Sequence, residues 1–213
     1  RLGRGSGDFE IPGRWQGVMT WETDPAKKIS YNMGVDVNSE DLGKLFLTTN
    51  AGINYRPVDN FSISADVAYS VREGLLVYRG TGRYTMYEAT QWSPKITSDY
   101  FISANQQLRF SMQWTGLKAY GDTFYQVDTT RLAELREVPN PSMNPDNFSI
   151  SRMTFQARYR WEIAPLSDLF IVYTRGGNLP GNTFDDYPGL FEQAWSEPVV
   201  DTLVVKLRYR FGS

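Results

Sequence analysis

Charged side chains occupy positions that share one face of a predicted β-strand, at every second position in 158–162 and 206–210 and singly in two earlier segments. The residues concerned are Asp36, Asp66, Arg158, Arg160, Glu162, Lys206, Arg208 and Arg210. Facing a polar lumen, they could select or orient a charged solute. The alternative is a set of ion pairs that fill a small or plugged barrel, because buried charges are normally paired.

Aromatic rings and carboxylates form a second candidate group in the long connection 176–201. Its members are Phe184, Asp185, Asp186, Tyr187, Phe191 and Trp195. Aromatic rings beside carboxylates could stack on sugar rings or bind Ca²⁺, which would make carbohydrate a ligand of this loop. The alternative is that the loop packs on its neighbours. Loops often contribute to function, so both readings stay open.

Several kinds of chemistry are excluded by composition. The sequence contains no cysteine and no histidine, so it has no disulfide, no thiolate metal site and no Ser-His-Asp or histidine-zinc mechanism. No other catalytic constellation is recognisable, and we expect neither enzymatic activity nor a cofactor or dedicated metal site. The formal net charge of −2 provides no basic surface for nucleic acid.

Eight segments alternate between apolar and polar residues and a ninth, 168–175, is apolar on both faces, which together predict an all-β fold of antiparallel strands. Their ranges are 14–23, 29–38, 45–56, 61–72, 83–101, 107–118, 149–163, 168–175 and 202–211. Pro94 predicts a bulge or an edge-like stretch in the fifth. Residues 73–82 and 119–148 are predicted as connections, the second with a short helix around 130–136.

The final segment shows the pattern most clearly. Leu203, Val205 and Leu207 lie on one face, and the cations of the segment lie on the other. A strand between lipid and a polar lumen has this pattern for a physical reason. The short connections 24–28, 57–60, 103–106 and 164–167 alternate with mostly longer ones, as in outer-membrane barrels.

We therefore predict an antiparallel transmembrane β-barrel of the outer-membrane type over residues 1–213, with the lipid bilayer around it and the bacterial outer membrane as its location. A soluble β fold is the alternative. The mean hydropathy of −0.43 and the absence of a long apolar run exclude a helical membrane protein. Thirteen Tyr, 12 Phe and 6 Trp suit the aromatic girdles of a barrel.

The odd number of strands has two explanations, because bacterial single-chain barrels contain an even number. Residues 1–213 could be the C-terminal strands of a larger barrel, which the strand-like pattern of 14–23 favours. Otherwise residues 29–211 form an eight-stranded barrel that follows a leader.

Three stretches resemble a known family. These are R-W-E-I-A-P-L-S-D-L-F-I-V-Y-T at 160–174, the segment 99–119, and the closing L-V-V-K-L-R-Y-R-F. They resemble the end of large outer-membrane proteins of Gram-negative bacteria, in which a module like carbohydrate-binding family 9 precedes a long C-terminal β-barrel. The resemblance implies an outer-membrane location and a connection with glycans, and it implies no known reaction.

Two functions follow as hypotheses. The first is a porin-like barrel that binds or passes a solute through a charged lumen, and a glycan-related molecule is one candidate for this solute. The second is a closed structural barrel that anchors a surface domain, a periplasmic domain or another outer-membrane or periplasmic protein.

Overall fold

A single antiparallel sheet contains nearly all of the regular structure. The computed structural model describes residues 9, 11–128, 134–140, 147–181 and 185–211. The described strands are β1 (Gln16–Glu22), β2 (Ile29–Ser39), β3 (Leu45–Val58), β4 (Phe61–Gly80), β5 (Arg83–Ser103), β6 (Gln106–Val127), β7 (Leu135–Val138), β8 (Phe148–Ala164), β9 (Ser167–Gly181) and β10 (Val200–Arg208). A short 3-10 turn, η1 (Asp41–Gly43), and one helix, α1 (Tyr187–Ser196), complete the described elements.

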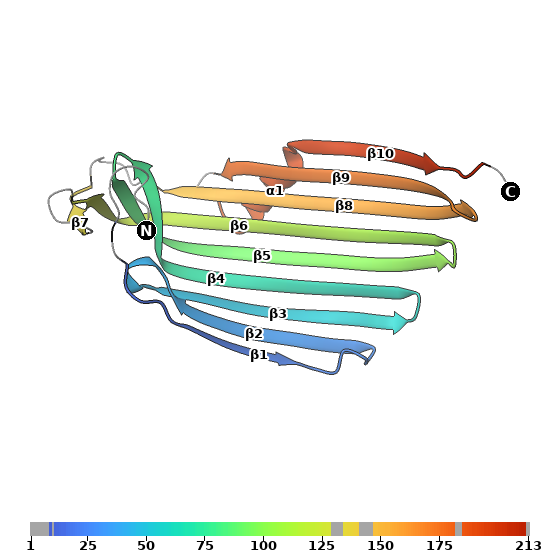
Figure 1. Ribbon diagram of the computed structural model, residues 1–213, viewed down its shortest axis with the longest axis horizontal. Coiled ribbons are helices and arrows are strands. Elements are labelled where there is room, and N and C mark those ends of the chain that lie inside the picture. Colours follow the sequence, from blue (N-terminus) through green and yellow to red (C-terminus); the bar gives the residue numbers. More distant parts are fainter. Residues whose placement is uncertain (1–8, 10, 129–133, 141–146, 182–184, 212–213) are drawn as a thin grey trace.

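The sheet follows the order of the chain. Its path is β1-β2-β3-β4-β5-β6-β8-β9-β10, and β7 pairs with the far part of β6 (Figure 1). This confirms the prediction of an all-β antiparallel fold. In the described part of the chain the sheet is open, with β1 and β10 as its two edges.

Nine of the strands overlap the nine predicted ranges, but several are longer. Residues 73–82 are not a loop, because β4 continues to Gly80 and pairs with the start of β5 across a tight turn. Gly80, Thr81 and Gly82 all have positive φ angles there, a backbone conformation that glycine adopts without steric cost. The prediction of a long connection at this point was therefore wrong.

The other differences also arise from tertiary pairing. β6 runs to Val127 and β9 to Gly181, beyond the ends predicted for them. Residues 135 and 136 belong to β7 rather than to the predicted helix, and residues 130–133 lie outside the described residues. β10 ends at Arg208, so the last three residues of the range 202–211 are not in the strand.

Pro94 does not produce the predicted bulge. It pairs directly with Val67, and the register between β5 and β6 is the same before and after it. The irregularities of β5 lie elsewhere, between Met86 and Tyr87 and between Phe101 and Ser103.

The two faces of the sheet differ in character. Met19, Val35, Thr49, Tyr69 and Trp92 are consecutive cross-strand partners, so they share one face, here called the apolar face. This face continues on β6, β8, β9 and β10 and includes Leu203, Val205 and Leu207. The charged and amide side chains of the alternate positions form the opposite face, here called the polar face.

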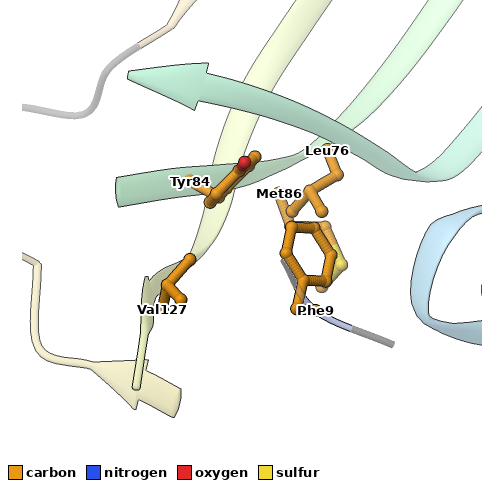
Figure 2. Close-up of a cluster of buried hydrophobic side chains, with 5 residues drawn as sticks. All are labelled: Phe9, Leu76, Tyr84, Met86 and Val127. Carbon is orange, nitrogen blue, oxygen red and sulfur yellow. The ribbon is translucent and has the colours of Figure 1, made fainter. Parts of the chain in front are cut away.

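Among the described residues, the apolar cluster with the most buried side chains lies at the end of the sheet away from the short turns. The extended parts of β4, β5 and β6 meet there, together with β7, Phe9 and Ile11 (Figure 1). Figure 2 shows the buried side chains of this cluster, which are Phe9, Leu76, Tyr84, Met86 and Val127. None of them is more than 6% exposed. The cluster forms a small packed lobe beyond the flat part of the sheet.

Candidate functional site

The predicted charged residues that lie within strands share the polar face. Asp36 is opposite Thr48, and Asp66 is opposite Lys95. Arg158 is opposite Arg109, which is itself opposite Asp99. Asp36 and Asp66 lie on β2 and β4, whereas Glu162 and most of the basic residues lie on β8 and β10.

The acidic residues on β2 and β4 accept hydrogen bonds from amide side chains. Asp36 accepts from Nε2 of Gln16 at 2.7 Å and from Nδ2 of Asn38 at 3.1 Å. Asp66 accepts from Nδ2 of Asn32 at 3.3 Å. It lies over Gly52, where a Cβ atom would overlap its carboxylate. This part of the face is an amide network rather than a row of ion pairs.

Arg160 on β8 and Arg208 on β10 converge on Asp168, which sequence reasoning did not single out. Nε of Arg160 donates to Asp168 at 3.0 Å, and the guanidinium of Arg208 pairs with the other carboxylate oxygen. Asp168 is only 1% exposed, whereas both arginines are about half exposed. Asp168 is separated from Phe170 and Val172 by even numbers of positions in β9, so it lies on the polar face with them. The period of two along the strand is the sequence signal that would have placed Asp168 on this face.

The remaining predicted charges are less tightly held. Arg158 donates to Oε1 of Gln156 at 2.9 Å. Arg210 lies beyond β10 and contacts Ser167 through its backbone N–H at 3.0 Å. Among the described residues, the side chains of Glu162 and Lys206 form no ion pair and no hydrogen bond.

Three of the six predicted loop residues, Tyr187, Phe191 and Trp195, belong to α1, which packs on the apolar face. The rings of Tyr187 and Phe191 contact Trp114 edge-on at centroid distances of 6.3 and 5.6 Å. Trp195 contacts Phe155 at 5.8 Å. These rings therefore point to the sheet, as expected if the loop packs on its neighbours. Phe184 lies outside the described residues.

The ends of α1 are fixed by polar contacts. The Asp186 side chain caps the first turn by accepting from the Gly189 N–H at 2.8 Å, and the Asp185 carbonyl accepts from Nζ of Lys118 at 2.6 Å. At the other end, the guanidinium of Arg175 donates to the Trp195 carbonyl at 2.6 Å. A cation at this end also complements the helix dipole.

Polar contacts also join the helix to the sheet beneath it. Ser151 accepts from Nε1 of Trp114 at 2.9 Å and donates to the Leu190 carbonyl at 2.6 Å. The Tyr187 hydroxyl shares a hydrogen bond of 2.6 Å with Thr90, and burial raises the pKa of that hydroxyl. In the part of the chain that is described, no three acidic side chains are grouped so as to hold a metal ion.

Close approach of the helix depends on a glycine. A Cβ atom on Gly177 would overlap the carbonyl oxygen of Ala194 and would lie 3.1 Å from the carbonyl carbon. Leu190 and Ala194 are fully buried as a result. Neither Gly177 nor Ser151 has a distinctive sequence signal, because the contact joins segments that the sequence pattern does not connect.

Comparison with known proteins identifies the family of the chain. A family model described as "Domain of unknown function (DUF5916)" matches residues 4–211. The chain therefore belongs to this family. No curated protein and no solved structure matches the chain. No described helix is both long enough and apolar enough to cross a membrane.

Proposed function

We propose that this member of the DUF5916 family forms the wall of a transmembrane β-barrel in the bacterial outer membrane, and that its lumen binds or passes a charged solute. In this proposal the apolar face contacts lipid and the polar face lines the lumen. The supporting observation is that the apolar face has exposed large apolar side chains on seven of the nine strands of the main path, namely β1, β2, β3, β5, β6, β8 and β10. Met19, Met33, Leu203 and Val205 are each 55–75% exposed.

An exposed face of this extent is unfavourable in water. Apolar patches on soluble monomers rarely exceed a few hundred Å². The transfer of apolar surface out of water contributes roughly 25 cal/mol per Å². Lipid removes this penalty without a second protein layer, and α1 covers only the part of the face over β6, β8 and β9.

The stagger of the strands supports a barrel. One row of cross-strand partners runs from Met19 on β1 to Ser151 on β8. Met19 is three residues from the end of its strand at Glu22, whereas Ser151 is 13 residues from the end of β8 at Ala164. Strands of a barrel tilt against its axis, and this tilt requires such a progressive stagger.

Strand direction limits how the barrel closes. The main path has nine strands and every neighbouring pair is antiparallel, so β1 and β10 run in the same direction. An all-antiparallel closure therefore needs an odd number of additional strands between them. A second copy in the same membrane orientation would present edges of the same direction and could not supply this closure. The other solution is one parallel seam, as in the 19-stranded mitochondrial channel.

The alternative function is a closed barrel that anchors a domain or a partner protein. The Arg160–Asp168–Arg208 contacts and the 2.7 Å ion pair between Arg109 and Asp99 favour it, since inward ion pairs of this kind fill a lumen. A carbohydrate ligand is a further proposal, motivated by the family resemblance of the C-terminal half.

Site-directed spin labels test the assignment of the faces. The chain has no cysteine, so Met33→Cys and Asn32→Cys each create a single labelling position on β2. Each labelled variant is studied in outer-membrane vesicles by power-saturation EPR. We expect the Met33 label to collide mainly with oxygen and the Asn32 label mainly with a water-soluble nickel complex. Equal accessibility at the two positions would refute the proposed membrane wall.

Planar-bilayer conductance of the same protein separates the two functions. A barrel that passes a solute shows discrete conductance steps. A closed anchor shows none, although its spin-label pattern is unchanged.

A further inference from the structure

Two adjacent rows of the polar face bring cations and apolar side chains together near the short turns. One row contains Arg160, Phe170 and Lys206, and the next contains Arg109, Arg158 and Val172. We call these six residues the cationic band. It lies on β6, β8, β9 and β10, next to the Arg160–Asp168–Arg208 contacts.

The band contains a like-charge pair. Arg109 and Arg158 are directly opposite each other on β6 and β8. Directly opposite side chains have Cβ atoms about 4.5–5.5 Å apart, and like charges at this spacing are destabilising. Asp99 accepts hydrogen bonds from Arg109 at 2.7 Å and from Gln107 at 3.0 Å. Its single negative charge therefore balances the charge of one guanidinium, that of Arg109. Among the described residues, the Arg158 side chain contacts only the neutral Oε1 of Gln156.

Carboxylates are too few to neutralise the whole region. The polar face of β6, β8 and β10 near the short turns contains five described cations, which are Arg109, Arg158, Arg160, Lys206 and Arg208. The neighbouring described carboxylates on this face are three, namely Asp99, Glu162 and Asp168. The local excess of positive charge attracts an anion.

The centre of the band is apolar. Phe170 is the direct cross-strand partner of both Arg160 and Lys206, and Val172 is the partner of Arg158 and of Val204. Val204 is 50% exposed on this face. An aromatic ring and two valines beside cations form a surface for the apolar part of a ligand whose anionic group contacts the cations.

We propose that the cationic band binds an oxyanion attached to an apolar body, with the anionic group at Arg158 and Lys206 and the apolar part against Phe170 and Val172. Arginine binds carboxylate and phosphate oxygens in a bidentate manner, and charge-assisted hydrogen bonds are the strong ones. This inference rests on the proposed function, because it names the class of solute that the lumen takes.

Calorimetry with small probes tests the proposal. The natural protein, reconstituted in phosphatidylcholine nanodiscs, is titrated with benzoate, phenyl phosphate and benzyl alcohol, which share an aromatic ring and differ in the polar group. We expect one or both anions to bind at least about tenfold more tightly than the neutral alcohol. The stronger of the two identifies the oxyanion as carboxylate or phosphate.

Variants locate the binding. Arg158→Gln and Lys206→Gln each weaken binding of the preferred anion by about tenfold or more. Arg152→Gln is the matched control, because Arg152 lies on the same face of β8 six residues away and donates to Asn178. It leaves affinity within about twofold, a difference below 0.5 kcal/mol.

Stability provides a second measurement. Loss of Arg158 relieves its repulsion with Arg109, so the Arg158→Gln variant unfolds at an equal or higher temperature than the natural protein while it loses binding. A lower unfolding temperature would mean that the side chain is structural and would overturn the proposal. Equal affinities for the anions and the alcohol, or an equal effect of Arg152→Gln, would also overturn it. If the spin-label pattern on β2 is retained in that case, only this inference fails and the proposed membrane wall stands.

Discussion

Gly177 determines how closely α1 approaches the sheet, and Gly177→Ala is the sharpest test of that packing. A Cβ at this position would overlap the Ala194 carbonyl oxygen and lie 3.1 and 3.2 Å from the carbonyl carbon and Cα of the same residue. Carbon atoms at optimal separation are about 3.5–4.0 Å apart. Because the obstructing atoms are backbone, the helix itself must move away.

The cost follows from this overlap. Insertion of a methyl group into a packed contact typically costs about 1–3 kcal/mol. The usual benefit of replacing glycine, a less flexible unfolded chain, does not offset this cost, because residue 177 remains in β9 whether or not the helix is docked. Docking weakens by about 1–3 kcal/mol, which increases the undocked population about 5- to 150-fold.

The undocked population is measured by the reactivity of a buried cysteine. Leu190→Cys places a thiol at a fully buried position of α1 in a chain without other cysteines. Its rate of reaction with a water-soluble maleimide reports how often the helix leaves the sheet. Gly177→Ala in this background should accelerate labelling by the factor given above.

Gly176→Ala is the matched control. A Cβ on Gly176 would lie 3.4 Å from the Met153 carbonyl oxygen and 3.9 Å from Val200, both ordinary contacts on the opposite side of β9 from Gly177. It should change the labelling rate less than about twofold, a difference below 0.5 kcal/mol. Equal rates for the two alanine variants would refute the assignment of Gly177 as the contact that sets helix position.

Two further predictions concern the faces of the sheet. Val35→Arg places a charge on the apolar face of β2 and should lower the free energy of unfolding by about 2–4 kcal/mol if that residue lies near the middle of the membrane. Asp36→Arg on the polar face should lower it much less. Urea unfolding in lipid vesicles measures both values, and equal losses would contradict the assignment of faces. Asp168→Asn removes the charge that Arg160 and Arg208 share, whereas the carboxylate that Asp36→Asn removes accepts hydrogen bonds from amide N–H groups. Asp168→Asn should therefore lower the thermal unfolding temperature more than Asp36→Asn. The reverse order would mean that Asp168 does not hold β8, β9 and β10 together.

The strands were predictable wherever alternation was strict. In β2, Tyr31, Met33 and Val35 alternate with polar or small residues, and the structure places them on one face of a strand from Ile29 to Ser39. The period of two is a direct consequence of backbone geometry, so it requires no knowledge of the neighbours. The same argument placed Asp36, Asp66, Arg158 and Arg160 on a common face.

Strand ends were predicted less well because pairing partners determine them. Leu75 and Leu76 follow Glu73 and Gly74, where alternation is lost, yet β5 offers Tyr87 and Met86 as partners and the strand continues past a bulge. Pro94 reads locally as an interruption. The missing N–H of Pro94 does not shift the register, because β5 pairs with both β4 and β6 before and after this residue.

The sequence by itself determined the β class, the two faces of each strand and the face on which the charged side chains lie, because these depend only on the backbone repeat. Only the tertiary structure decided which charges meet, that Asp168 lies between Arg160 and Arg208, and that Arg109 faces Arg158. It alone showed that α1 covers the apolar face at Gly177 and that the edges β1 and β10 run in the same direction. These features depend on register between segments distant in the chain, which no local pattern encodes.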